Sequence, residues 1–195
     1  GSEMCIRDRV IAVNLRGVID GCRVFLPALR ERPEAHIVNL SSIAGLAGFP
    51  WQTLYCATKF GVRGFSAALR SELVGQGIGV TCVLPGATRS NIVGAAASRS
   101  PELTAGLSDK LTKLGYPPSA LARKVLRGVR WNRAEVRSGP DGWATSLAMR
   151  LVPSLVRGSM RALVWGARSR GLVADAPVAS GPTPSALEAE RPEPE

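Results

Sequence analysis

The residues best suited to chemistry in this chain are Ser42, Tyr55 and Lys59. Ser42 follows an apolar, strand-like run (His36 to Leu40), and a Gly-rich loop then leads into a helix-like segment that carries the tyrosine and the lysine. Residues four apart share one face of a helix, so we expect the phenol and the ammonium to point into one site. A positive charge beside a phenol favours the phenolate, which can then act as a general acid or base. With a serine hydroxyl nearby, the set predicts proton transfer to or from a carbonyl or alcohol oxygen.

Four ordered motifs resemble the short-chain dehydrogenase/reductase family, Rossmann-fold enzymes that move hydride between NAD(P) and a carbonyl or alcohol. The serine stands thirteen residues before the tyrosine of Tyr-x-x-x-Lys, which is the usual spacing in the family. VNLRG looks like the helix segment with the family's catalytic asparagine, here Asn14. IGVTCVLPGATRSNI looks like the next strand and its Pro85-Gly86 turn. The resemblance covers roughly Arg9 to Gly139.

The resemblance implies a catalytic role for four residues. Tyr55 would protonate or deprotonate the substrate oxygen, and Ser42 would hold and polarise that oxygen. Lys59 would bind the nicotinamide ribose hydroxyls and favour the phenolate. Asn14 would position a water that relays protons toward the lysine. An asparagine that only terminates backbone hydrogen bonds in a kinked helix is the alternative at position 14.

The same resemblance implies a binding site for NAD or NADP. Besides the tyrosine and lysine of the helix, it would include Pro85 and Gly86, whose backbone would lie close to the nicotinamide. Ser90 stands where the family usually has a threonine whose hydroxyl bonds the carboxamide, and Thr88 is the competing candidate.

The family's Gly-rich dinucleotide turn does not precede Asn14, and neither does the residue that selects between NAD and NADP. MCIRDR looks like translated transposase adapter sequence, so residues 1–8 are expected to be non-native. The chain is then the C-terminal part of a dehydrogenase and is expected to be inactive alone, because pyrophosphate binding needs the missing glycines. A natural short protein that begins at Met4 is the alternative.

Composition favours one globular domain in a reducing cytoplasm. The chain has 195 residues, of which 45% are hydrophobic, and this is enough for a real core. It contains no uncharged apolar run of eighteen residues and no secretory signal pattern at its N-terminus. Its four cysteines show neither metal-type spacing nor a disulfide framework, so no metal site is predicted.

The net charge of +10 is unevenly distributed. Residues 101–171 carry thirteen Lys/Arg against four Asp/Glu, whereas residues 172–195 carry five acids and one base. Aromatic residues make up only 5% of the chain, and no nucleic-acid-binding motif is present, so no nucleic-acid partner is expected. A solvated, Arg-rich face is the preferred interpretation.

Apolar runs separated by helical patterns predict an α/β fold. We expect the C-terminal part of a Rossmann-like, doubly wound parallel sheet, with its first strands and helices missing, over residues 9–139. The pattern predicts helices at 9–30 (with a kink or late end at Pro27), 51–74 and about 119–129 (with Ser119 as N-cap), and strands at 35–40, 78–84 and 134–137. Residues 85–116 are expected to form a flexible lid with short helices.

The sequence of residues 140–170 predicts a basic helical extension. The sequence of residues 171–195 predicts a disordered tail. Arg150, Arg157, Arg161 and Arg168 fall on one helical stripe, although Pro153 is expected to break the helix in two. Such a helix could lie on an anionic membrane surface, or it could pack on the enzyme or on a second subunit. Packing on the protein is preferred, because amphipathicity most often marks a core-facing helix.

Three other interpretations stay open. A sugar-nucleotide epimerase or dehydratase of the same fold also uses Tyr-x-x-x-Lys, although SSIAG and the short C-terminal lobe favour the simple dehydrogenase. A non-catalytic oligomerising protein is a second possibility, since helices 9–30 and 51–74 resemble those that build homo-oligomers in the family. A basic membrane-surface protein is the third. For an enzyme, the Ala- and Leu-rich segment 91–116 suggests an apolar alcohol or ketone as substrate.

Overall fold

The computed structural model describes residues 3–89 and 115–171. A π-helical turn, η1 (Ala12–Arg16), joins the first two helices, and a short 3-10 turn, η2 (Ile43–Gly45), follows the first strand. The strands are β1 (Ala35–Leu40), β2 (Ile78–Pro85) and β3 (Glu135–Ser138). The helices are α1 (Glu3–Ile11), α2 (Gly17–Arg30), α3 (Thr53–Glu72), α6 (Pro118–Arg130), α7 (Gly139–Leu151) and α8 (Pro153–Ser169).

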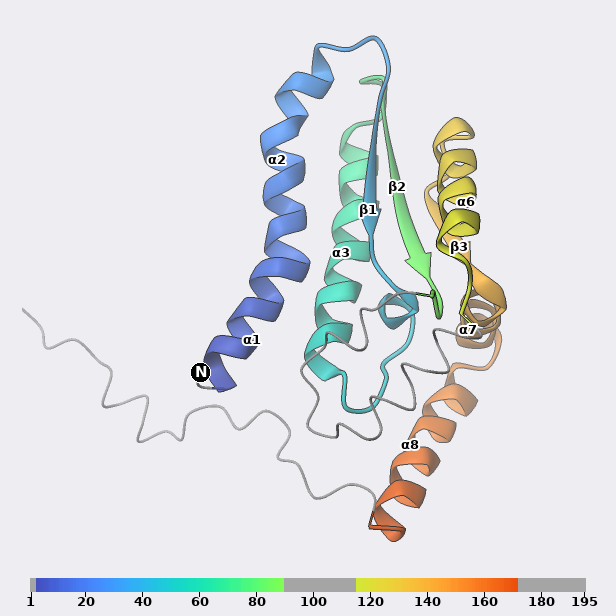
Figure 1. Cartoon of the computed structure of the whole chain (residues 1–195). Helices are drawn as coiled ribbons and strands as arrows, with labels where there is room; N and C mark the ends of the chain where they lie inside the picture. Colours follow the sequence, from blue (N-terminus) through green and yellow to red (C-terminus); the bar gives the residue numbers. More distant parts are fainter. Residues whose placement is uncertain (1–2, 90–114, 172–195) are drawn as a thin grey trace, which may run out of the picture. The chain divides into compact units, whose positions relative to one another are not determined.

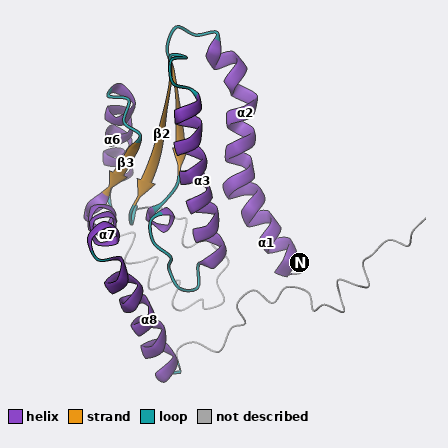
Figure 2. Ribbon diagram, turned by 180° about the vertical axis from the view of Figure 1, so that it is seen from behind, coloured by secondary structure: helices purple, strands orange, loops and turns teal. Residues whose placement is uncertain are grey.

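The three strands form a parallel sheet in the order β1-β2-β3. Helices α2 and α3 cover one face of this sheet, and α6 packs on the other (Figures 1 and 2). Leu40 pairs with Val83, and Pro85 pairs with Ser138, so all three strands end at the same edge. The predicted α/β, Rossmann-like architecture is confirmed, and this edge is where open parallel sheets bind ligands.

The core lies on both sides of β2, whose residues from Ile78 to Leu84 are all buried. This matches the apolar run in the sequence, because a central parallel strand has no solvent-facing side. Under α2 and α3 the core contains Cys22, Ile37, Leu69, Leu73, Ile78 and Val80. Each large aliphatic side chain buried in this way contributes about 1.5–3 kcal/mol. The thiols of Cys22, Cys56 and Cys82 are buried and free, as small hydrophobes in the core.

Three helix starts differ from the sequence prediction. Helix α3 begins at Thr53, two residues after the predicted start. The N-terminal helix begins at Glu3, not at Arg9, and continues through the π turn to Arg30, three residues beyond Pro27. Of the two outcomes predicted at this proline, a kink or a late end, the structure shows the late end. Helix α6 begins at Pro118, and its N-cap is Pro117, so Ser119 as N-cap was wrong. A proline is well suited to the first helical position, since its fixed φ fits the helix and its missing N–H is not needed there.

The C-terminal helical stretch is divided where the proline predicted a break. Helix α7 ends at Leu151, Val152 leaves the helical conformation, and α8 begins at Pro153. The chain forms two compact units, residues 1–156 and 157–195. No helix in the described ranges is both long and apolar enough to span a bilayer. The expected lid falls mainly on residues 90–114 and the expected tail on residues 172–195, both outside the described residues.

Candidate active site

Lys59 links helix α3 to the carboxyl end of β1. Its ammonium lies 5.6 Å from the centre of the Tyr55 ring, one helical turn earlier. The same ammonium donates a hydrogen bond of 3.1 Å to the carbonyl oxygen of Leu40, the last residue of β1. The lysine therefore contacts both the tyrosine ring and the chain segment that immediately precedes Ser42.

The environment of Lys59 weakens its charged form. Partial burial lowers the pKa of the Lys59 ammonium below its ordinary value, and the nearby Cys82 thiol acts in the opposite direction. A desolvated ammonium keeps its charge more easily when a carbonyl accepts a hydrogen bond from it, as the Leu40 carbonyl does here. One of the three ammonium donors is committed in this way, and two are left for another acceptor.

Ser42 is the N-cap of the 3-10 turn η2, which leads away from β1. Its hydroxyl oxygen accepts a hydrogen bond of 3.2 Å from the backbone N–H of Ala44. Accepting this bond fixes the position of the oxygen but does not use the hydroxyl proton, so the hydroxyl can still donate. The side chain is half-buried, unlike that of its neighbour Ser41.

The loop after β1 is held directly on the backbone of α3. The hydroxyl of Ser41 donates to the carbonyl oxygen of Lys59 at 2.8 Å. A Cβ atom at Gly45 would lie 2.8 Å from the same carbonyl oxygen and 2.5 Å from the Ser41 hydroxyl. Only glycine lets the loop approach this closely, so Gly45 fixes the distance between the Ser42 segment and the helix.

The other polar residue near the serine pair, Asn39, has a structural partner. It is buried, and its side-chain amide donates to the hydroxyl of Ser66 on α3 at 3.0 Å. Its amide oxygen also accepts a weak bond from the Cys22 thiol. Asn39 and Ser41 thus connect β1 and its loop to the covering helices.

Asn14 lies in the π turn η1, which packs against α3. The contact is close because Gly61 on α3 has no side chain: a Cβ atom there would be 3.0 Å from Leu15. The Asn14 side chain is half-buried. No hydrogen bond among the described residues joins it to Tyr55 or Lys59. The structure therefore brings the segment of Asn14 to the catalytic helix without a direct bond to the predicted partners.

The turn that follows β2 is fixed by Asp141, a residue that the motif analysis missed. The carboxylate of Asp141 accepts a hydrogen bond from the backbone N–H of Ala87 at 2.5 Å. It also fills the space beside Gly86, where a Cβ atom would clash with both carboxylate oxygens. The close approach of Asp141 is thus sufficient to explain why a glycine stands at position 86. A contact of Pro85 and Gly86 with a cofactor stays a prediction.

Asp141 carried a signal that could have revealed it. Ser138-Gly-Pro-Asp141 has the spacing of a capping box at the start of a helix, and α7 does begin there. The side chain of Ser138 makes no cap bond, however, and the carboxylate turns to the Gly86 turn instead. The sequence could predict the helix start but not this long-range contact.

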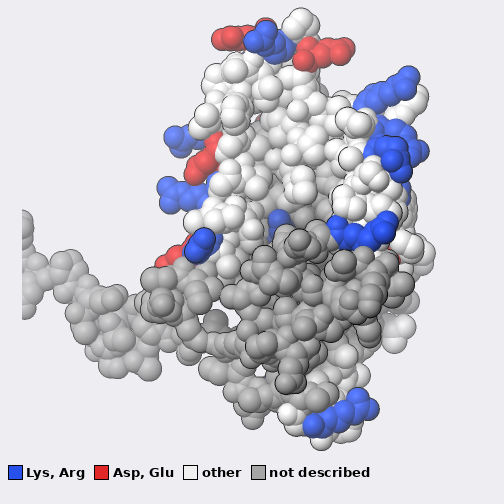
Figure 3. Space-filling model, in the orientation of Figure 1, with Lys and Arg blue, Asp and Glu red and all other residues white. Residues whose placement is uncertain are grey.

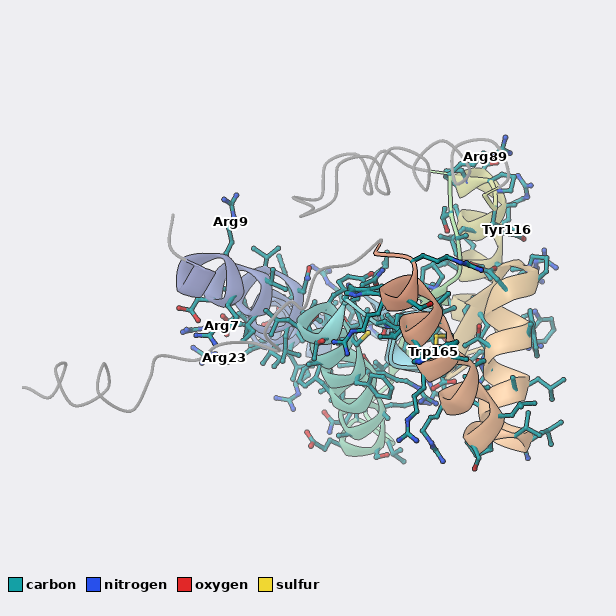
Figure 4. The ribbon with its side chains drawn as sticks, turned by 90° about the horizontal axis from the view of Figure 1, so that it is seen from below. Arg7, Arg9, Arg23, Arg89, Tyr116 and Trp165 are labelled. Atoms are coloured by element: carbon teal, nitrogen blue, oxygen red, sulfur yellow. The ribbon has the colours of Figure 1, made fainter. Side chains whose placement is uncertain are left out.

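The remaining predicted cofactor residues lie just beyond this turn. The Thr88 hydroxyl donates to the Gly86 carbonyl oxygen at 3.1 Å. The backbone of Tyr116 closes the turn, donating to Ala87 at 2.7 Å and accepting from Arg89 at 3.1 Å. Figure 4 shows Arg89 and Tyr116 next to each other. Ser90 lies outside the described residues.

A parallel sheet with a Tyr-x-x-x-Lys helix beside the carboxyl end of its first described strand defines a Rossmann-like protein of the dehydrogenase type. The family model for short chain dehydrogenase matches residues 3–100, half of the chain. The chain belongs to the short-chain dehydrogenase/reductase family.

Similar proteins from bacteria and animals carry oxidoreductase names. The chain is 34% identical over 163 residues to "Probable oxidoreductase EphD" of Mycobacterium tuberculosis, an alignment that covers 79% of this chain and 28% of that protein. It is 31% identical over 133 residues to "Dehydrogenase/reductase SDR family protein 7-like" of Drosophila melanogaster, covering 68% of this chain and 39% of that protein. The chain thus spans well under two thirds of the length of these relatives.

Solved structures of the family show the same architecture. A short-chain dehydrogenase/reductase from Burkholderia phymatum in complex with NAD matches with a TM-score of 0.64 and 25% identity, over 73% of this chain and 57% of that one. A short-chain dehydrogenase from Streptomyces avermitilis matches with a TM-score of 0.63 and 26% identity, over 88% of this chain and 64% of that one.

Proposed function

We propose that this chain is the C-terminal part of an NAD(P)-dependent oxidoreductase that interconverts an alcohol and a carbonyl compound. The observation that carries the proposal is the position of Lys59, whose ammonium contacts the Tyr55 ring and the Leu40 carbonyl beside Ser42. The partial coverage of the relatives supports the view that the active enzyme is longer.

In this proposal the reacting oxygen of the substrate lies between two hydroxyl groups. Tyr55 gives a proton to the carbonyl oxygen during reduction and takes one from the alcohol during oxidation. Ser42, whose oxygen is held by the Ala44 N–H, donates a hydrogen bond to the same substrate oxygen. The ammonium of Lys59 lies 5.6 Å from the centre of the Tyr55 ring, on the same side of the helix as the proposed substrate oxygen. Asn14, on the segment packed against α3, holds the water of the proton relay.

The residues present fit the nicotinamide end of a cofactor, NAD or NADP. A bound nicotinamide supplies or accepts the hydride. Two ammonium donors of Lys59 remain after the bond to Leu40, and they suit the ribose hydroxyls. The tyrosine would complete this part, and the backbone of Pro85 and Gly86 would lie close to the nicotinamide. The carboxamide would bond the hydroxyl of Ser90 or, as the competing candidate, that of Thr88. The NAD complex of the Burkholderia structure supports a nicotinamide cofactor.

Substrate, assembly and location are extensions of the same proposal. The Ala- and Leu-rich sequence of residues 91–116 supports an apolar alcohol or ketone. The exposed apolar side chains of α2, Val24 and Phe25, support a homo-oligomer. The free, buried cysteines support a reducing cytoplasm.

The test is the variant Tyr55→Phe in the longer protein, obtained by extending the gene upstream. We expect kcat to fall about 10²–10⁴-fold, because the proton donor is lost. The dissociation constant for NADH or NADPH, measured by fluorescence titration, should change little. The matched control is Tyr116→Phe, which removes the hydroxyl of the chain's other tyrosine and should leave kcat nearly unchanged. Full turnover in the Tyr55→Phe variant would refute the proposal.

A further inference from the structure

We propose that α8 binds the surface of a membrane that contains anionic lipids. Residues 142–171 contain five arginines and no Asp or Glu. A helical segment with charge of one sign only is attracted to a surface of the opposite sign, and each basic residue near such a surface strengthens binding about fivefold. This interaction is separate from the catalytic chemistry proposed above and does not depend on it.

The arginines of α8 lie on one side of the helix. Arg157, Arg161 and Arg168 are spaced four and seven residues apart, and at 3.6 residues per turn they fall within about 40° of one another. Figure 3 shows the Lys and Arg side chains on one face of the molecule in blue. A helix that lies flat on a bilayer needs such a charged side, whose long side chains reach the lipid headgroups.

The apolar side chains of α8 are arranged around this stripe. Leu155 and Leu163 each lie about 140° from the centre of the stripe, on opposite sides, with the small residues Ser159 and Gly166 between them. Trp165 lies about 60° from that centre, at the border of the charged side. Tryptophan prefers this border in membrane-bound helices, because its ring is apolar and its N–H is polar.

No residue of α8 is buried. The exposed fraction is 69% for Leu155, 55% for Leu163 and 75% for Trp165, which is labelled in Figure 4. A nucleic acid would satisfy the arginines but would offer no apolar layer for the two leucines. A bilayer surface provides anionic headgroups and hydrocarbon at adjacent depths, so it fits both sets of residues.

Vesicle flotation of the whole 195-residue chain tests the proposal. The chain is first cleared of aggregates by ultracentrifugation and is then mixed with vesicles of phosphatidylcholine containing 30% phosphatidylglycerol, or of phosphatidylcholine alone. We expect flotation with the anionic vesicles at low salt, much weaker binding at 0.5 M NaCl, and little binding to the neutral vesicles.

Matched variants separate α8 from general basic charge. Arg157→Gln with Arg161→Gln should lower the partition coefficient about 30-fold, at about fivefold per arginine. The control is the double variant Arg123→Gln with Arg127→Gln on α6. These two arginines are also four residues apart and exposed, and their loss should change the partition coefficient much less. Trp165→Ser should weaken binding about tenfold or more, because an apolar anchor is lost.

The exposed Trp131, at the end of α6, provides the control for the tryptophan, and Trp131→Ser should bind as the unchanged chain does. The proposal is overturned if the unchanged chain stays in the bottom fraction, or if it floats equally well with neutral vesicles. Equal losses in the α6 and α8 variants would also overturn it, as would binding to an RNA oligonucleotide without binding to vesicles.

Discussion

At the scale of single residues, Lys59 determines the geometry of the candidate site in two ways. Its backbone carbonyl accepts the Ser41 hydroxyl and thereby holds the loop after β1. Its side chain crosses to the Leu40 carbonyl and contacts the Tyr55 ring. The position of Ser42 relative to the helix is therefore set by the same residue that we propose assists the tyrosine.

This arrangement predicts that Gly45 cannot be replaced. Gly45→Ala would force a Cβ atom against the backbone oxygen of Lys59, and overpacking of this kind costs about 1–3 kcal/mol. Urea unfolding of the chain should show this loss. Gly48→Ala is the control in the same loop, because a Cβ atom there meets nothing within 4 Å, and it should leave stability nearly unchanged. Equal stability of the two variants would contradict the described packing.

The sequence was sufficient for the residues that lie close together along the chain. Ser42, Tyr55 and Lys59 fall within one strand-loop-helix unit, so their spacing alone predicted that they share one end of the sheet. Asp141 and Gly86 are far apart in sequence, and their contact depends on the pairing of β2 with β3. No local pattern can specify such a contact.

At the scale of elements, Glu135 connects the edge strand β3 to helix α3. Its carboxylate accepts hydrogen bonds from Arg63 on α3 at 2.7 Å and from Arg137 on β3 at 2.6 Å. Burial alone would raise the pKa of the Glu135 carboxyl, but the two arginines outweigh it and hold this pKa below its ordinary value of 4.5. The paired carboxylate thus favours the folded state wherever it is ionised.

Replacing this carboxylate should destabilise the chain. Glu135→Gln should cost about 1–3 kcal/mol at pH 7, because two partly buried arginines lose a charged partner. The contribution is present above pH 4.5, where the unfolded carboxyl is ionised, and is lost as the pH falls through the lower folded pKa. Unfolding at pH 7 and pH 3 measures both effects. Glu34→Gln, at an exposed loop position, should change stability by less than about 0.5 kcal/mol.

The periodicity of the sequence predicted which segments are helices and which are strands. It did not predict irregular turns within those helices. The strand at 35–40 and the helix over Tyr55 and Lys59 were predicted correctly, because their apolar patterns are long and clear. The π turn at 12–16 was not predicted. Leu15 of this turn packs against Gly61 on α3, a contact between segments that the sequence alone does not bring together.

At the scale of the whole molecule, we propose that the chain offers only part of a cofactor site. Among the described strands, β1 pairs with β2 alone, so its other edge is open to a further strand. Fluorescence titration of the 195-residue chain with NADH and NADPH should show no binding in the micromolar range, because the chain lacks the glycine turn for the pyrophosphate. The longer protein should bind under the same conditions. Micromolar binding by the shorter chain would contradict this.

The burial of three free thiols gives a direct way to time how each part of the molecule opens. Cys22 lies on α2, Cys56 on α3 and Cys82 on β2, and burial raises the pKa of Cys82 to about 11. An alkylating reagent reacts with the thiolate, so each site should be modified only during the moments when its element is exposed to solvent. In a Cys5→Ser background, mass spectrometry of the labelled peptides would therefore rank the helices and the central strand by the frequency of their local unfolding.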